Sequence, residues 1–416
     1  MDFFKVFDTI VDIMHHDYSG FKDKRGWDDP ERIRRKMKAL DSERKLNRLS
    51  FGQLVEDYLL DFKDEHNALR SSQEGAPQTS VGFRVRRYGP HLYVERVTQE
   101  RQLHIGDVIT AIDGESIESV AVAERRWLKS DIPERERWES VLLKAKTILV
   151  KKENGEELIL PLQRYEDKSE AAHYTFESMN GIAVFRFNDF TDLDQMKRLF
   201  SSHKNKIQNL EQWVIDVREC RGGSDDVYFP LMNAVFPPNP IIVEDGLEHQ
   251  MTERNYRNRL ASFQKFNQIG QHPLIDALIT QMKAHRNAGF VTFNLSDYEE
   301  DYKMTGSESP RQIVVLTDKF CASSGEQFVL EARQSPKVTV MGRPTRGVLD
   351  YSNCAIEHFE KEGYDFYYAT SRSKRVDYGA GVDFHGIEPD QYIPWTPEHL
   401  HHDVDLEAAI RHLKKA

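Results

Sequence analysis

Hydrophobic residues recur at helical spacing in the first part of the chain. The positions Phe4, Phe7, Ile10, Val11 and Met14 repeat every three or four residues, as on one face of a helix. Asp28-Asp-Pro-Glu31 has the residues of a helix start, with proline in the first turn. A third amphipathic run follows Ser50 and ends at Asp64-Glu-His66. The pattern predicts a helical N-terminal domain over residues 1–72.

The pattern changes to short strands beyond that point. The segment from Ser71 to Pro77 has the small, polar, proline-containing composition of a linker. Runs that alternate or are continuously apolar follow at residues 81–85, 91–97, 107–112, 147–150 and 158–162. Asp113-Gly114 is a turn signal directly after the third of them. We predict a small, mostly-β domain over residues 73–165.

Buried strands alternate with helical stretches in the rest of the chain. The apolar runs lie at residues 182–185, 213–216, 313–316 and 338–341. Such alternation predicts an α/β core, here over residues 166–416. A polar, mostly helical segment at about 243–308 interrupts the core and reads as an insertion, a lid or a subunit contact. The fold class expected is therefore a multidomain α/β (α+β) protein.

Composition narrows the setting in which the protein works. The 416 residues carry a formal net charge of -11, which argues against nucleic acid and anionic membranes as partners. Three cysteines are too few for a disulfide framework. No run approaches the roughly 20 apolar residues of a membrane span, and the N-terminus lacks the features of a signal peptide. We expect a cytoplasmic protein.

Histidine spacing bears on metal binding. His15-His16 and His401-His402 are adjacent pairs, which cannot both face one ion from a regular helix. We expect these four residues to lie on the surface, and we expect neither a metal nor another cofactor.

Four segments in the second half of the chain carry a family resemblance. Asp216–Gly223 is similar to a D-x-R-x-N-x-G-G turn, with Cys220 in place of the asparagine. Thr317–Phe328 is similar to a nucleophile segment, Gly342–Gly347 to G-x-x-T-x-G, and Gly386–Asp390 to G-[IV]-x-P-D. In this order they resemble the tail-specific (C-terminal-processing) and tricorn-type serine peptidases. The resemblance implies a helical cap, a PDZ domain and a core of the ClpP/crotonase type.

The resemblance implies that Ser323 is the nucleophile. A strand that ends at Leu316 passes through a short turn into a helix that starts near Ser323. Unpaired N–H groups and the helix dipole favour an oxyanion there. The oxyanion hole would be the amide of Ser324 with an amide of Gly222 or Gly223. The alternatives are a helix cap of the S-x-x-E type at Ser323 and a plain tight turn at the glycines.

The base follows from the tricorn branch of the family. The tail-specific branch uses a lysine where this chain has Val348, and a glutamine where it has Ser352. The tricorn branch takes a histidine from the helical segment, at the position of His66, and an acidic residue at the position of Asp383. Ser323, His66 and Asp383 are therefore the triad that the resemblance implies. The alternative for His66 is an ordinary surface histidine.

The loop Ser80-Val-Gly-Phe83 resembles the carboxylate-binding loop of PDZ domains. Backbone N–H groups of Val81, Gly82 and Phe83 would capture a peptide C-terminus while the peptide adds as a strand. The alternative is a domain of this fold that packs structurally and binds nothing.

The function expected is a serine peptidase that acts on peptides or proteins through Ser323, with the PDZ domain recognising peptide or gating the site. One alternative is a catalytically inactive peptide-binding scaffold, which Val348 and Cys220 favour. Another is a hydrolase of a non-peptide ester or amide. Cys321 as nucleophile is a further alternative, although a lone cysteine is more often a small buried hydrophobe. The insertion leaves self-association into a homo-oligomer open.

Overall fold

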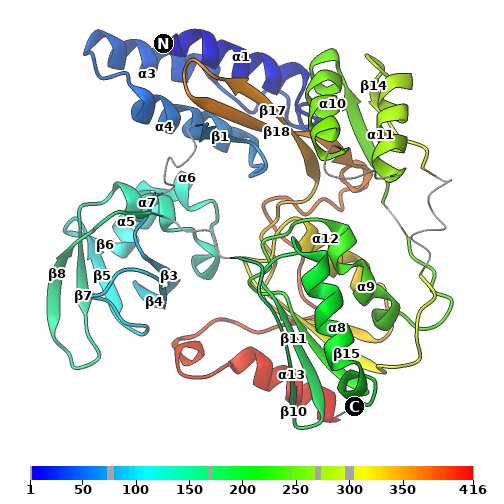
Figure 1. Ribbon diagram of the computed structural model, residues 1–416. Helices are drawn as coiled ribbons and strands as arrows, with labels where there is room; N and C mark the ends of the chain where they lie inside the picture. The colour runs from blue at the N-terminus through cyan, green and yellow to red at the C-terminus, as the bar shows by residue number, and fades with distance from the viewer. Residues whose placement is uncertain are drawn as a thin grey trace. The chain divides into compact units, whose positions relative to one another are not determined.

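The computed structural model describes residues 2–72, 79–166, 171–243, 245–267, 273–295 and 304–415. The linker expected from Ser71 to Pro77 lies for its greater part outside the described residues. The chain forms two compact units that do not follow sequence order. The first comprises residues 1–76, 241–304 and 348–383, and the second comprises residues 77–240, 305–347 and 384–416. Figure 1 shows the two units, with the N-terminal helices in blue and strands β17 and β18 in orange.

Helices and an antiparallel sheet build the first unit. The N-terminal helices are α1 (Phe3–His16), α2 (Phe21–Lys24), α3 (Pro30–Ser42) and α4 (Arg48–Leu59). Asp2, Asp29 and Asn47 cap the first, third and fourth of them by accepting hydrogen bonds from backbone N–H groups. The sheet contains β1 (Ala68–Ser71), β18 (Tyr364–Ser373), β13 (Leu247–Met251) and β14 (Gly289–Val291), with β17 (Tyr351–Phe359) also paired to β18. One hydrophobic core joins Phe7 and Tyr58 of the helices to Phe366 of the sheet.

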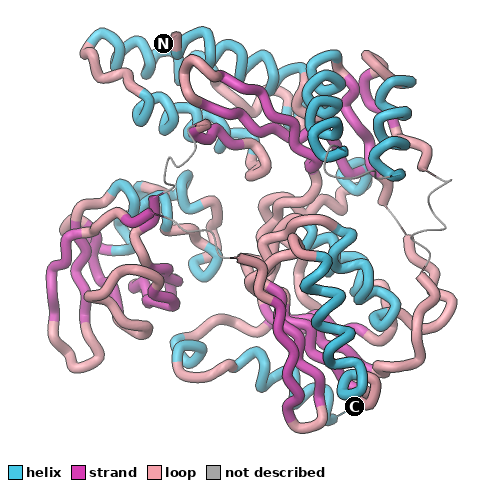
Figure 2. Tube along the Cα trace, viewed as in Figure 1, coloured by secondary structure: helices cyan, strands magenta, loops and turns pink. Residues whose placement is uncertain are grey.

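Strands occur in two segments of this unit that the sequence predicted to be helical or mostly helical. A strand, β1, occupies part of the N-terminal segment expected to be helical, because Ala68–Ser71 pairs with Tyr364–Tyr367 of a distant strand. The insertion contains two helices, α10 (Glu253–Asn267) and α11 (Pro273–Ala284), and they lie between the paired strands β13 and β14. The hairpin of β17 and β18 was not foreseen, and Figure 2 shows it as two long strands.

A small antiparallel sheet forms the N-terminal part of the second unit. It is ordered β3 (Phe83–Tyr88), β4 (His91–Val97), β5 (Val108–Ile112), β7 (Thr147–Lys151) and β8 (Glu157–Pro161). Short helices α5 (Ile117–Ala123), α6 (Arg125–Leu128) and α7 (Glu139–Lys144) accompany it around the buried Trp138. The five strands predicted from the sequence are present within about three residues of their expected bounds. Asp113 and Gly114 both have positive φ, as their turn requires.

A mostly parallel sheet forms the core of the second unit. Its order is β10 (Tyr174–Met179), β11 (Ile182–Phe187), β12 (Gln212–Asp216), β15 (Gln312–Thr317), β16 (Val338–Gly342) and β19 (Gln391–Tyr392). All neighbours from β11 to β19 are parallel. The C-terminal helix α13 (Val404–Lys415) covers one face, where Leu406 contacts the core that contains Val214 and Val314. Helices α8 (Leu193–Ile207), α9 (Asp225–Val235) and α12 (Ser324–Ala332) lie on the other side (Figure 1). The α/β class predicted for this part of the chain is confirmed, although residues 241–304 and 348–383 of the range expected for the core belong to the first unit.

Candidate active site

The parallel register brings two of the motif segments to one edge of the core sheet. Asp216 of β12 pairs with Leu316 of β15, so the segments that follow both strands emerge side by side. The amide of Val217 donates to the carbonyl of Leu316 at 3.0 Å. Farther along, the amide of Ala322 donates to the carbonyl of Cys220 at 2.9 Å. The glycine turn and the serine turn are therefore held together by backbone hydrogen bonds.

Ser323 lies at the start of α12 in an unusual backbone conformation. Its φ of 55° and ψ of -124° are strained for a residue with a side chain. Its neighbours Ala322 and Ser324 are buried, whereas Ser323 itself is half-buried. A strained turn from a strand into a helix exposes a nucleophile and places the next backbone N–H beside it. The amide of Ser324 belongs to the first turn of α12, where N–H groups have no partner within the helix.

Gly222 lies directly against this serine. Its φ is +90°, and a Cβ at this position would lie 2.7 Å from the Cβ of Ser323 and 3.1 Å from the nitrogen of Ser324. Gly223 approaches another backbone segment, since a Cβ there would lie 2.0 Å from the carbonyl oxygen of Phe190. The Ser324 hydroxyl donates to the carbonyl of Gly223 at 3.0 Å. The structure thus brings together the four residues expected at the nucleophile and the oxyanion hole.

Glu326 connects the serine turn to two of the other motifs. Its side chain is fully buried, and one oxygen accepts the backbone N–H of Ser323 at 3.2 Å. The other oxygen accepts the Thr345 hydroxyl at 2.6 Å and the amide of Gly347 at 2.7 Å. The Thr345 hydroxyl in turn accepts the amide of Ile387 at 2.7 Å. Glu326 is therefore both part of a capping box and the centre of a network that the sequence alone did not reveal.

His66 and Asp383 lie in the first unit, and Ser323 with the glycine pair lies in the second. His66 follows the short 3-10 helix Leu60–Phe62, in the turn before β1. Its amide donates to Oδ1 of Asp64 at 2.9 Å, and its Nδ1 lies 3.6 Å from the same oxygen. The alternative reading of His66 as an ordinary surface histidine fits only in part, because its side chain is 16% exposed.

Asp383 accepts hydrogen bonds from the amides of Leu349 at 2.9 Å and Asp350 at 2.8 Å. Its second oxygen lies 3.7 Å from Nζ of Lys24, which is also buried. Burial and the negative charge of Asp64 raise the pKa of Asp383, against the opposing effect of Lys24. Asp64 and Lys24 are residues that sequence reasoning missed. The one signal for Asp64 was its place two residues before the histidine.

The cysteines near the serine do not behave as nucleophiles. Burial raises the pKa of Cys220 to about 12 and raises the pKa of Cys321 well above its usual value. Both thiols are therefore protonated at neutral pH. All three cysteines of the chain are free rather than joined in disulfides.

The loop expected to bind peptide termini is folded tightly in the structure. Val81 and Phe83 are buried. The carbonyl of Gly82 accepts the amides of Thr98, Gln99 and Glu100 at 2.8, 2.9 and 3.2 Å. Gly82 has a φ of +77°, and a Cβ there would lie 2.7 Å from the ring of Tyr165. These contacts hold the loop Ser80–Phe83 at the start of β3.

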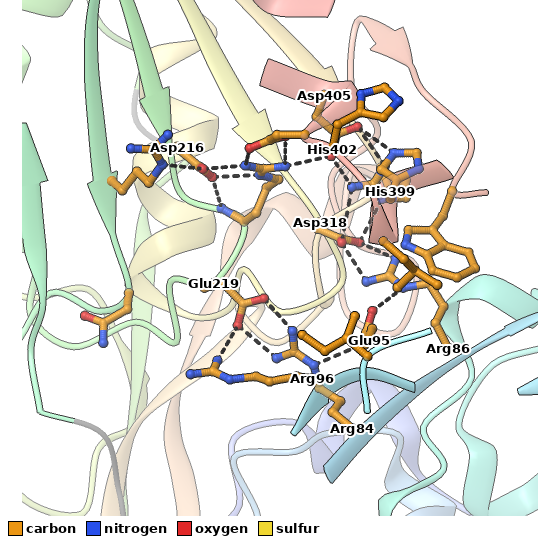
Figure 3. A pocket seen from close by; sticks show the side chains of 18 of the residues that line it. Arg84, Arg86, Glu95, Arg96, Asp216, Glu219, Asp318, His399, His402 and Asp405 are labelled. Carbon is orange, nitrogen blue, oxygen red and sulfur yellow. Dashed lines mark hydrogen bonds and ion pairs between the residues drawn. The ribbon is translucent and has the colours of Figure 1, made fainter. Parts of the chain in front are cut away.

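A charged cleft of about 770 Å³ lies in the second unit, between strands β3 and β4 and the loops that follow β12, β15 and β16. Arg84 donates to both carboxylate oxygens of Glu219 at 2.9 and 2.7 Å. Arg86 does the same with Asp318 at 3.0 and 2.7 Å, and Arg343 approaches Asp318 from the other side at 3.1 Å. Figure 3 shows these pairs as one continuous network.

The charges that line this cleft balance each other. Six arginines face six carboxylates, with four histidines beside them. Although burial alone would raise the pKa of Asp318, Arg343 and Arg86 hold it well below the usual range. The network therefore joins the small sheet to the loops that carry Ser323 and Gly222, and it offers no surplus of one charge to a ligand.

Among the described residues, no group of three or more histidine, cysteine, aspartate or glutamate side chains could hold a metal ion. Within the same part of the chain, none of the helices has the length and apolar character needed to cross a membrane.

Comparisons with known proteins place this geometry in a family. The sequence model of peptidase family S41 matches residues 181–393, just over half of the chain. That range contains Ser323, both glycines and Asp383. A search of curated proteins found no match.

Three solved structures are similar to this chain. Mature CPAF complexed with lactacystin is similar over 100% of this chain and 97% of its own, with 11% identity and a TM-score of 0.65. A second structure of mature CPAF covers 98% of this chain and 95% of its own, with 12% identity and a TM-score of 0.63. The photosystem II D1 C-terminal processing protease covers 98% of this chain and 95% of its own, with 14% identity and a TM-score of 0.45.

The likeness to CPAF shows that the fold is shared along the whole chain. The family match includes the four segments from which the resemblance was drawn. The resemblance to tail-specific and tricorn-type enzymes is thereby confirmed: the chain is a serine peptidase and belongs to peptidase family S41.

Proposed function

We propose that this enzyme hydrolyses peptide bonds through Ser323, with His66 as general base and Asp383 as the acidic residue of the site. The observation that carries the proposal is the strained turn at Ser323, against which the backbone of Gly222 lies. Side-chain bulk at Gly222 would occupy the space beside the nucleophile and the Ser324 amide. The proposal requires the two units to bring His66 to Ser323.

The chemistry is acyl transfer in two steps. Oγ of Ser323 attacks the carbonyl carbon of the scissile bond, and the imidazole of His66 takes the hydroxyl proton. The oxyanion that forms is stabilised by the amide of Ser324 and an amide of the Gly222-Gly223 pair. Collapse of this intermediate breaks the C–N bond, and His66 returns the proton to the leaving amine. Water then attacks the acyl-enzyme with the same base and frees Ser323.

We further propose that the small sheet is a PDZ domain that recognises peptide C-termini and acts on the site. The support is the pair of bidentate ion pairs from β3. Arg84 engages Glu219 in the glycine turn, and Arg86 engages Asp318, five residues before Ser323. A peptide that adds beside β3 would therefore act on the strand to which both loops are attached.

Labelling by a fluorophosphonate probe tests the nucleophile and the base. We expect the native chain to be labelled, and Ser323→Ala and His66→Ala to lose labelling. Ser201→Ala and His16→Ala, which change exposed residues, serve as matched controls and should label normally. Labelling that survives His66→Ala would refute the proposed base. A folded native chain that never labels, with or without added peptide, would favour the inactive scaffold.

A further inference from the structure

We infer that Asp64 is the positioning residue of His66: its carboxylate orients the imidazole and stabilises the imidazolium. The inference deepens the proposed function and rests on it for the role of His66 as base. Oδ1 of Asp64 accepts the amide of His66 at 2.9 Å and lies 3.6 Å from Nδ1 of the same residue. Contacts of a catalytic base are commonly longer at rest than during reaction, so 3.6 Å is compatible with a hydrogen bond that tightens with substrate.

The Asp64 carboxylate is held rigidly from its other side. Its side chain is fully buried. Oδ2 accepts the Tyr18 hydroxyl at 2.8 Å and Nδ2 of Asn67 at 3.1 Å. Asn67 is itself anchored, since its Oδ1 accepts the amide of Ala369 in β18 at 3.2 Å. Tyr18 and Asn67 therefore hold Oδ2, and the amide of His66 holds Oδ1, which keeps the carboxylate facing His66.

The position of Asp64 favours one tautomer of the His66 imidazole. With a carboxylate facing Nδ1, the neutral ring holds its proton on Nδ1 and leaves a lone pair on Nε2. That is the tautomer that a general base for a serine needs. The carbonyl of His66 accepts the Cys354 thiol at 3.7 Å, which further restrains the turn.

The ionisation of Asp64 and Asp383 supports the assignment of Asp64, and not Asp383, as the residue that positions His66. Burial would raise the pKa of Asp64, but hydrogen bonding with His66 and the charge of Lys24 hold it below the usual value. Asp64 is therefore an anion at neutral pH, whereas the pKa of Asp383 is raised. The other titratable groups that interact with these carboxylates include Tyr18, Tyr351, Asp350 and Cys354.

Asp383 has different partners from those of Asp64. Oδ1 is occupied by the amides of Leu349 and Asp350, and Oδ2 faces Lys24. The Lys24 ammonium also donates to the Tyr18 hydroxyl at 3.1 Å and lies over the ring of Tyr351 at 4.0 Å. In its resting contacts Asp383 therefore holds the turn that follows Gly347 and faces Lys24.

The test combines NMR titration of His66 with the pH profile of the native enzyme, Asp64→Asn, Asp383→Asn and Glu65→Gln. Asparagine at position 64 keeps an oxygen for the His66 amide, so the turn is retained. We expect Asp64→Asn to lower the pKa of His66 by about one unit, because the neighbouring anion favours the imidazolium. Its kcat should fall by roughly 10²- to 10⁴-fold with KM little changed. The acid limb of kcat/KM should move to lower pH.

The other variants test whether the effect on His66 is specific to the carboxylate of Asp64. Glu65→Gln removes the carboxylate next to His66 in the chain, and because Glu65 is partly exposed it should lower the pKa of His66 less than Asp64→Asn does and leave the activity near the native value. Asp383→Asn should shift the pKa of His66 less than Asp64→Asn does. Tyr18→Phe, which removes one hydrogen bond to Asp64 and keeps the packing, should give an intermediate loss of kcat. Thermal melts establish that each variant is folded.

Two outcomes distinguish failure of the inference from failure of the proposed function. An unchanged His66 pKa in folded Asp64→Asn, or a larger shift in Asp383→Asn, overturns the role of Asp64. If Asp64→Asn lowers the His66 pKa while His66→Ala still labels normally, the pairing of the two residues stands and the base is wrong.

Discussion

Backbone conformation at single residues determines the geometry around the proposed nucleophile. Ser323 has a positive φ although it carries a side chain, and Gly222 has a positive φ because a side chain would overlap Ser323. Glu326 stabilises the strained turn by accepting the Ser323 amide and two donors from the Thr345–Gly347 segment. Such strain persists only when its surroundings enforce it, which is the role of the buried glutamate.

Substitution of Gly222 tests this arrangement. We expect Gly222→Ala to lower the rate of fluorophosphonate labelling by roughly 10²-fold or more, because the new methyl group would lie 2.7 Å from the Ser323 Cβ and displace an oxyanion donor. Gly155→Ala is the matched control, since Gly155 has a φ of +85° and no atom within 4 Å of its added Cβ. Gly155→Ala should lower the melting temperature through backbone strain alone. Equal labelling rates in the two variants would contradict the assignment.

At the level of elements, β3 and β4 are linked to the core by buried ion pairs. Arg86 is 2% exposed and lies between Glu95 and Asp318. Charges this deeply buried are retained only with partners on all sides, so removal of one leaves another uncompensated. The network therefore makes the position of the small sheet depend on the protonation of its carboxylates.

The pH dependence of stability follows from Glu95. Although burial alone would raise it, Arg86 and Arg84 lower the pKa of Glu95 to about 2. A carboxylate whose pKa is lowered by folding contributes stability above its unfolded pKa of about 4.3, and this is lost as the pH falls toward 2. We expect roughly 3 kcal/mol of unfolding free energy to disappear across that window.

Urea unfolding between pH 6 and 2.5 measures this effect. Glu95→Gln should be less stable at pH 6 and should show a shallower loss of stability on acidification, by about one proton. Glu157→Gln changes an exposed carboxylate in the same small sheet and is the control. A Glu95→Gln profile parallel to that of the native chain would rule out the ion-pair explanation.

At the level of the molecule, the chain passes between its two units five times. The proposed base and acid lie in one unit, and the proposed nucleophile and oxyanion hole lie in the other. Residues 77–166, which include the small sheet, follow His66 directly in the chain and belong to the unit of Ser323. We therefore expect a ligand on the small sheet to act on the unit that contains Ser323.

Peptide addition tests this expectation. We expect peptides with a free C-terminal carboxylate to raise the rate of labelling at Ser323 several-fold, because their binding at Ser80–Phe83 would act on β3. Amidated peptides of the same sequence should have no effect. Arg84→Gln, which breaks the link to Glu219, should still bind peptide but respond less. Equal rates with and without peptide would exclude gating at this loop.

Much of the architecture could be predicted from local patterns. The helical periodicity at Phe4–Met14, the strands of the small sheet and the four core strands all appear in the structure. Each signal is local because side chains that face a core recur with the period of their own element. Strand β1 and the hairpin of β17 and β18 could not be predicted in the same way, since their pairing joins residues 68–71 to 364–367.

In the candidate site, too, some residues could be identified from local sequence and others only from the folded structure. Ser323, Ser324 and the two glycines could be identified from short motifs, because close backbone approach and a helix start impose residue types at fixed spacing. The role of Glu326 as a link between three motifs, and the contact of Asp64 with His66, depend on residues brought together only by folding. Sequence by itself determined the family and located the turn at Ser323. Tertiary structure alone decided which carboxylate faces the histidine, because burial and distance are properties of the folded chain.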